Sequence, residues 1–159
     1  MMKISSALLF SIALLASPAI AGELDNMTNS FCVDVQMDQT ATESGYKKED
    51  AKAFLELTLQ KNGVKIFDKC ANAITVAIFS TKTVIQNTNL PEFYAFAVTF
   101  TVGEKAKLIG RKKQKEQVVT TYLQSAAALL KKSELNRLND EALKPIADAF
   151  SNEFLKAAQ

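Results

Sequence analysis

The sequence contains no histidine and no tryptophan, and it has only five glycines and two cysteines among its 159 residues. Without histidine, the chain lacks the imidazole that activates serine and cysteine nucleophiles and that often serves as a general base. The glycines form neither a G-x-G-x-x-G nor a P-loop pattern, which argues against a nucleotide-binding loop of either kind. These absences favour a protein that is not an enzyme.

The N-terminus has the layout of a secretory signal peptide. Lys3 provides a positive start, Ala7–Ala16 an apolar core, and Ala19-Ile20-Ala21 a small-x-small cleavage site before Gly22. The apolar run is shorter than the ~20 residues that a helix needs to cross a bilayer. No cysteine follows the cleavage site, as a lipid anchor would require. We therefore expect a periplasmic or secreted protein that loses residues 1–21 and keeps no transmembrane segment.

The two cysteines, Cys32 and Cys70, are too far apart in the sequence to form a C-x-x-C redox motif. An even cysteine count in an exported chain favours a disulfide. Two cysteines without histidine make a poor zinc site. The alternative is a pair of buried free thiols, which would be the expectation for a cytosolic protein. We predict a structural disulfide between Cys32 and Cys70.

The remaining chain is predicted to be one domain, 31–159, behind a short flexible leader at 22–30. Alternating apolar residues indicate strands, and helical spacing indicates helices. In chain order, we expect a strand at 31–40, a loop at 41–46, a helix at 47–63, a short strand at 64–67, strands at 74–84, 92–102 and 118–130, and a terminal helix at 133–159. We expect Pro145 to kink the last helix or to begin a second segment, because proline lacks a backbone donor.

The clearest alternation is in the strand at 92–102. Its large apolar face consists of Tyr94, Phe96, Val98, Phe100 and Val102, and its small-residue face of Ala95, Ala97, Thr99 and Thr101. If the helices cover the first face, the second is free to seat a partner or a second copy. The ordinary alternative is a sheet face partly exposed to water, which is common in antiparallel sheets.

The order of elements predicts an α+β fold, a two-layer sandwich with one mostly antiparallel sheet of about four to five strands and two helices on one face. We expect the strands at 31–40 and 64–67 to be parallel neighbours, joined by a right-handed crossover through the helix. That arrangement would bring Cys32 close to Cys70.

Two stretches, SGYKKEDAKAFLELTLQKNGVKI and SELNRLNDEALKPIADAFSNEFLKA, flank a predicted hairpin. In this order they resemble small exported bacterial domains with a β-α-β-β-β-α arrangement, most of which are uncharacterised. The resemblance covers most of the mature chain and rests on the pattern of elements. It implies a fold and no catalytic residues.

Two acidic residues of the first strand, Asp34 and Asp38, share one predicted face. Paired carboxylates can act as general acid and base or can bind calcium. The ordinary alternative is the solvated face of a strand, because nothing nearby in the sequence indicates tuned acidity.

Basic residues are concentrated in one run. Subtracting Lys3 of the signal peptide from 19 basic residues leaves 18, against 17 acidic ones, so the charge is nearly balanced overall. The segment 105–115 nevertheless contains six bases and no acid: Lys105, Lys107, Arg111, Lys112, Lys113 and Lys115. The run is either a solvated hairpin tip or a contact for an acidic protein or an anionic envelope component. No aromatic residues interleave with these charges, so we do not expect nucleic acid as a partner.

The sequence as a whole favours an exported, non-enzymatic binding or accessory module that acts through surface contacts, without a cofactor or a metal. One alternative is a carboxylate-based hydrolase around Asp34 and Asp38. Another is a small-molecule or lipid carrier with a cavity between helices and sheet. A filled core with a flat surface would favour the module. The oligomeric state is left open.

We predict that signal cleavage follows Ala21, because Ala19-Ile20-Ala21 is a small-x-small cleavage site that follows the apolar core. Intact-mass analysis of the exported protein should give a chain that begins at Gly22. A mature protein that retains Met1, or that stays in the cytoplasm, would contradict the export argument.

Overall fold

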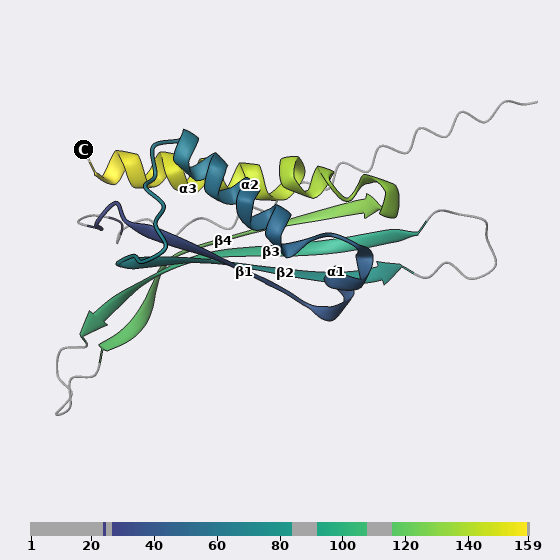
Figure 1. Ribbon diagram of the computed structural model, residues 1–159, viewed down its shortest axis with the longest axis horizontal. Helices are drawn as coiled ribbons and strands as arrows, with labels where there is room; N and C mark the ends of the chain where they lie inside the picture. Colours follow the sequence, from purple (N-terminus) through teal and green to yellow (C-terminus); the bar gives the residue numbers. More distant parts are fainter. Residues whose placement is uncertain (1–23, 25–26, 84–91, 108–115, 159) are drawn as a thin grey trace, which may run out of the picture.

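The computed structural model describes residues 24, 27–83, 92–107 and 116–158 (Figure 1). These residues form four strands, three α-helices and two short helical turns. In chain order they are β1 (Phe31–Met37), α1 (Gln39–Ser44), α2 (Lys48–Lys61), β2 (Asn72–Thr83), β3 (Phe93–Lys107), β4 (Glu116–Lys131), the 3₁₀ turn η1 (Lys132–Glu134), the π turn η2 (Asn139–Leu143) and α3 (Lys144–Ala157).

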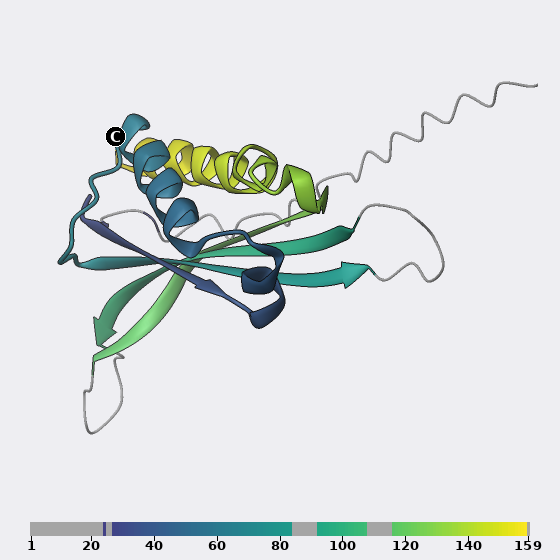
Figure 2. The ribbon, with the colours of Figure 1, turned by 45° about the vertical axis from the view of Figure 1, so that its right-hand side comes forward.

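The strands form one sheet in the order β1-β2-β3-β4. β1 is parallel to β2, and the other two pairings are antiparallel. Helices α2 and α3 lie side by side over one face of this twisted sheet (Figures 1 and 2). The predicted two-layer α+β fold is therefore confirmed. Within the described residues, no helix is long and apolar enough to span a bilayer.

The core lies between the sheet and the helices. On β3 the large apolar face, Tyr94 to Val102 in steps of two, is buried as the alternation predicts. The helices contribute Leu55 and Leu59 of α2 and Phe150 and Phe154 of α3, all buried. Full burial of each such side chain is worth roughly 1.5–3 kcal/mol relative to exposure, so this layer supplies most of the driving force for folding.

The prediction of a loop at 41–46 is wrong. The chain instead forms α1, whose N-cap is Asp38: the backbone N–H of Ala41 donates to Asp38 Oδ1 at 2.7 Å. Gly45 ends the helix in the left-handed conformation, with φ at 97°. An acidic N-cap and a glycine just past the last turn are ordinary helix boundaries, and together they stabilise a helix of only six residues.

The short strand predicted at 64–67 is reduced to one parallel bridge, between Phe31 and Ile66. Phe31 N–H donates to Lys65 O at 3.0 Å, and Phe67 N–H donates to Phe31 O at 2.8 Å. The full parallel neighbour of β1 is β2, with Val33 opposite Ile74. The predicted parallel contact between the two segments is present at Phe31 alone, and the prediction missed β2 as the long parallel neighbour, because an apolar run of four residues carries little information on pairing.

The C-terminal helix divides close to Pro145, as expected. The π turn η2 ends with Lys144 N–H donating to Asn139 O, five residues earlier, and Pro145 then occupies the first turn of α3. Proline is tolerated there because the first N–H groups of a helix have no partner within the helix.

The strands predicted at 92–102 and 118–130 both extend further into the segment between them than the prediction allowed. β3 continues to Lys107 and β4 begins at Glu116. The register shifts between Val102 and Gly103, so β4 carries one extra residue there. A Cβ on Gly103 would lie 2.7 Å from Cγ1 of Val118, which explains why glycine occupies this position.

Part of the segment expected to be a flexible leader packs against the domain. Leu24 and Met27 are buried within the core cluster. The Asn29 side chain donates to Gly63 O at 3.2 Å and accepts from Lys65 N–H at 2.8 Å. Polar composition alone did not reveal these two buried side chains.

The predicted disulfide is present. Cys32 in β1 is bonded to Cys70, which lies between the Ile66 bridge and β2, and their Cα atoms are 5.5 Å apart. The bond ties the start of β1 to the end of the α2–β2 connection, so it closes the loop that contains both α1 and α2.

We predict that Cys70→Ser lowers the free energy of unfolding by about 2–4 kcal/mol, because the unfolded chain regains the entropy of the open loop. Chemical denaturation of the oxidised protein with and without reductant measures this difference. Reductant should destabilise the native chain and leave the Cys70→Ser variant unchanged. Equal denaturation midpoints for native and variant proteins under oxidising conditions would contradict a stabilising role.

Candidate functional site

Among the described residues, none covers the face of the sheet opposite α2 and α3. Side chains that alternate with the buried ones point to this face, and most are exposed or half-buried. We define the open face as Cys32, Asp34 and Gln36 of β1, Ala73, Thr75, Ala77 and Phe79 of β2, Ala95, Ala97, Thr99 and Thr101 of β3, and Leu123, Ser125, Ala127 and Leu129 of β4. The small-residue strand face predicted from the sequence forms its third row.

The open face is apolar and smooth near its centre. Ala97 lies between Phe79 of β2 and Ala127 of β4 in the register. Phe79 is 53% exposed, and Leu123 and Leu129 are each 47% exposed. From β2 to β4 the set defined above contains no charged side chain. Exposed apolar surface of this kind, gathered on one face, is typical of contact surfaces.

The two acidic residues singled out in the sequence have different environments. Asp34 is exposed on the open face, and its Oδ1 lies 3.7 Å from Nζ of Lys48. Asp38 follows β1 and caps α1, and its second oxygen, Oδ2, accepts a hydrogen bond from Ser80 N–H at 3.1 Å. Both Asp38 oxygens are thus engaged by backbone donors, as expected of a structural cap.

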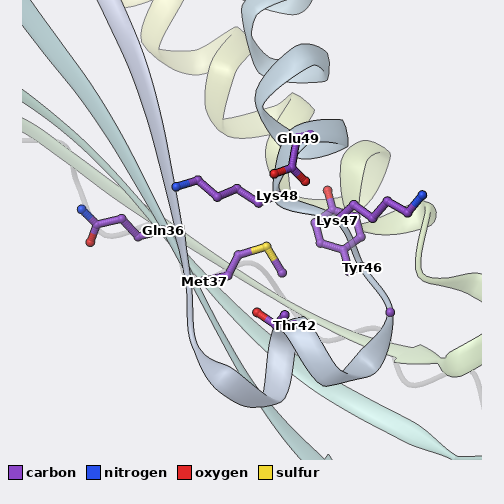
Figure 3. A pocket seen from close by; sticks show the side chains of 8 residues that line it. Gln36, Met37, Thr42, Tyr46, Lys47, Lys48 and Glu49 are labelled. Carbon is purple, nitrogen blue, oxygen red and sulfur yellow. The ribbon is translucent and has the colours of Figure 1, made fainter.

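A hollow of about 650 Å³ lies where β1 leads into α1 and α2 begins (Figure 3). Its lining residues are Gln36, Met37, Thr42, Gly45, Tyr46, Lys47, Lys48 and Glu49. Met37 and Tyr46 give it an apolar floor, and Lys47, Lys48 and Glu49 surround it with mixed charge.

Tyr46 is the one buried titratable group of this hollow. Burial, and secondarily the charge of Asp50, raises the pKa of Tyr46 far above its ordinary value, so the phenol stays protonated. Its hydroxyl donates to Oδ1 of Asn139 in η2 and so ties the α1–α2 connection to the C-terminal helical segment. A neutral phenol committed to a structural hydrogen bond is not an activated nucleophile.

The basic run is only partly within the described residues. Lys105 is exposed on β3, opposite Val118 in the register. Lys107 is the last residue of β3, and its side chain is not described. Four of the predicted contact residues, Arg111, Lys112, Lys113 and Lys115, lie outside the described residues. In the described part of the chain, no three acidic or cysteine side chains are close enough to share a metal ion.

Comparison with known proteins identifies the fold and not a family. No family model and no curated protein matches the chain. Among solved structures, the PelC dodecamer from Paraburkholderia phytofirmans superposes with a TM-score of 0.52 at 10% identity, covering 87% of this chain and 95% of that one.

Two further solved structures are less similar. A minor lipoprotein from Acinetobacter baumannii gives a TM-score of 0.41 at 12% identity, over 80% of this chain and 91% of that one. The rare lipoprotein B from Shewanella oneidensis gives 0.32 at 15% identity, over 79% and 92%. At these identities the likeness concerns the fold alone.

Sequence reasoning found the open face through the alternation of β3, and it missed the role of Asp38. The available signal was Asp38 followed seven residues later by Gly45, which matches an N-cap and a C-terminal glycine around a short helix.

We predict that Asp38→Ala lowers the free energy of unfolding by about 1–2 kcal/mol, because the variant loses the cap of α1 and the bond to Ser80 N–H. Asp34→Ala is the matched control and should change stability by less than about 0.5 kcal/mol, since its ion pair is exposed. Urea denaturation measures both. Equal effects of the two substitutions would show that Asp38 is not a structural cap.

Proposed function

We propose that this protein is an exported, non-enzymatic module that works by surface contact, and that its open face binds a second copy of the same chain. The observation that carries the proposal is the open face itself, an exposed and largely uncharged surface opposite a well-packed helical layer. The proposal therefore concerns assembly and not chemistry.

The size of the open face suits a small, concentration-dependent interface between two copies. Strands are spaced about 4.8 Å apart, and the seven residues from Ala73 to Phe79 of β2 extend about 24 Å. Across four strands the face covers about 450 Å², or about 900 Å² for two copies, which is at the small end of the range for protein interfaces and typical of weak association. From β2 to β4 the defined residues are uncharged, which favours an equally uncharged partner, and a second open face meets that condition.

One observation supports export, and another supports self-association. The Cys32–Cys70 disulfide suits an oxidising compartment outside the cytoplasm. The similar fold of PelC was solved as a dodecamer, which makes self-association the first property to test here. The signal peptide predicted at 1–21 belongs to the same proposal.

The alternatives from the sequence have less support. A hydrolase would need a carboxylate free to act, whereas Asp38 uses both oxygens to hold backbone N–H groups. A carrier would need a cavity between helices and sheet, whereas the space around Phe150 is occupied by aromatic rings at centroid distances of 5.2–5.9 Å. The basic run from Lys105 to Lys115 remains a proposed contact for an anionic partner.

We predict that Ala97→Lys dissociates the assembly, raising its dissociation constant by about a hundredfold, because an unpaired ammonium would be buried at the centre of the interface. In the isolated chain the new side chain would be exposed, so the melting temperature should hardly change. Sedimentation velocity over a range of concentrations measures the association.

The matched control is Ala53→Lys, which places the same charge on the exposed side of α2. This variant should associate like the native chain. A native protein that sediments as a monomer at every concentration up to several hundred micromolar would contradict the proposal. So would equal dissociation of the two variants.

A further inference from the structure

A second feature lies on the helix-covered side of the sheet, at the end where β2 finishes and β3 begins. It is a recess of about 430 Å³ between α1 and η1. Its lining residues are Thr40, Glu43, Ser80, Thr81, Lys82, Tyr94 and Lys132. Hydroxyl groups and lysines therefore dominate its wall.

Ser80 is the most unusual member of this wall. Its side chain is only 8% exposed, and its Oγ has no hydrogen-bond partner among the described residues. Its backbone N–H donates a hydrogen bond to Asp38 Oδ2 at 3.1 Å, which fixes the position of the backbone at Ser80. A buried hydroxyl without a partner is costly and uncommon, which makes it a candidate for contact with a ligand.

Two lysines stand at the mouth of the recess and are held by one carboxylate. Lys82 Nζ donates to Glu92 Oε1 at 2.6 Å, and Lys132 Nζ lies 3.2 Å from Glu92 Oε2. The hydrogen bond from Lys82 lowers the pKa of Glu92, so this carboxylate is ionised at neutral pH. The three side chains together carry a charge of +1, and each ammonium keeps further donors that Glu92 does not use.

We propose that this recess binds an oxyanion group of a small ligand, with Ser80 Oγ donating at its inner end and the ammonium groups of Lys82 and Lys132 donating at its mouth. A carboxylate and a phosphate share the required chemistry, because both present several acceptor oxygens to convergent donors. Glu92 orders the two lysines in advance, which reduces the entropy that binding would otherwise cost.

Glu43 is the side chain of the recess that opposes an anion. It belongs to α1 and accepts a hydrogen bond from Gln39 Nε2 at 2.6 Å, which holds it toward its own helix. Its charge should weaken anion binding through space without blocking the donors. The recess lies on the side of the sheet away from the open face, so this proposal and the proposed self-association can fail independently.

The test is a nitrogen–proton NMR titration of the whole exported protein with inorganic phosphate and, separately, with sodium acetate, both at constant ionic strength. We expect saturable shifts at the backbone amides of Ser80, Thr81 and Lys82 with at least one anion. The anion that saturates at lower concentration identifies the preferred oxyanion.

Four variants make the test specific. Ser80→Ala should weaken binding by about fivefold while keeping the fold, because it removes a donor that has no partner within the described protein. Lys132→Gln should weaken binding by about tenfold, and Lys52→Gln, at a lysine of similar exposure, should leave it unchanged. Glu43→Gln should tighten binding by about threefold, a gain that a merely structural role for Ser80 would not produce.

Two results would overturn the proposal. One is the absence of saturable shifts at Ser80–Lys82 with either anion up to about 50 mM, well above the millimolar range of weak specific binding. The other is native affinity in the Ser80→Ala variant, which would mean that the Ser80 hydroxyl takes no part in binding.

Discussion

The packing of α3 onto the sheet through Phe150 is the interaction on which the rest of the structure depends. The ring of Phe150 lies 5.6 Å from Phe31 of β1, 5.4 Å from Phe100 of β3 and 5.2 Å from Tyr122 of β4. Phe154 adds an edge contact with Phe31 at 5.1 Å. One turn of one helix therefore joins three of the four strands, including both edge strands.

This packing is one-sided, and the surface properties of the molecule follow from it. The buried aromatic side chains of the strands point to the helices, whereas the alternate positions of the same strands carry mainly Ala, Thr and Ser. Those small side chains give the sheet a smooth second face with three exposed apolar residues, Phe79, Leu123 and Leu129. A sheet with helices on one face buries its core side chains there, and its other face stays exposed and suited to association.

The start of β1 is held on three sides. The backbone of Phe31 bonds to Lys65 and Phe67 on its outer edge, while Asn72 N–H donates to Ser30 O on its inner edge. The disulfide from Cys32 to Cys70 closes the same turn. The chain after α2 thus passes around the start of β1 before it enters β2, and the sheet order β1-β2 results from this path.

The sequence predicts those features that depend on local periodicity. The alternation from Tyr94 to Val102 is strong enough to define both faces of β3, and the spacing of Ala51, Leu55 and Leu59 defines the buried side of α2. The disulfide also follows from the sequence, because an exported chain with two cysteines has one possible pairing. The open face is therefore largely predictable.

Features that depend on contacts between distant residues were not predictable. β1 has parallel contacts both with Ile66 and with β2, and three-dimensional packing decides which of them becomes the long pairing. Asp38 alternates with Asp34 as if both belonged to a strand, but it caps α1 through Ala41 N–H, and only the structure reveals its second bond, to Ser80 N–H 42 residues later. The recess around Ser80 depends on that same contact and on Lys132, which is far away in the sequence.

The most direct test of self-association through the open face compares two phenylalanines. Phe79 lies on this face and Phe67 on the connection before β2, and they are 53% and 50% exposed, so they report equally on a single chain. With 4-fluorophenylalanine incorporated and each signal assigned through a Phe→Leu variant, a soluble paramagnetic agent measures the solvent access of each ring. The account predicts that Phe79 is shielded at high protein concentration and becomes accessible on dilution, while Phe67 stays accessible throughout. Equal access of both rings at every concentration would contradict it.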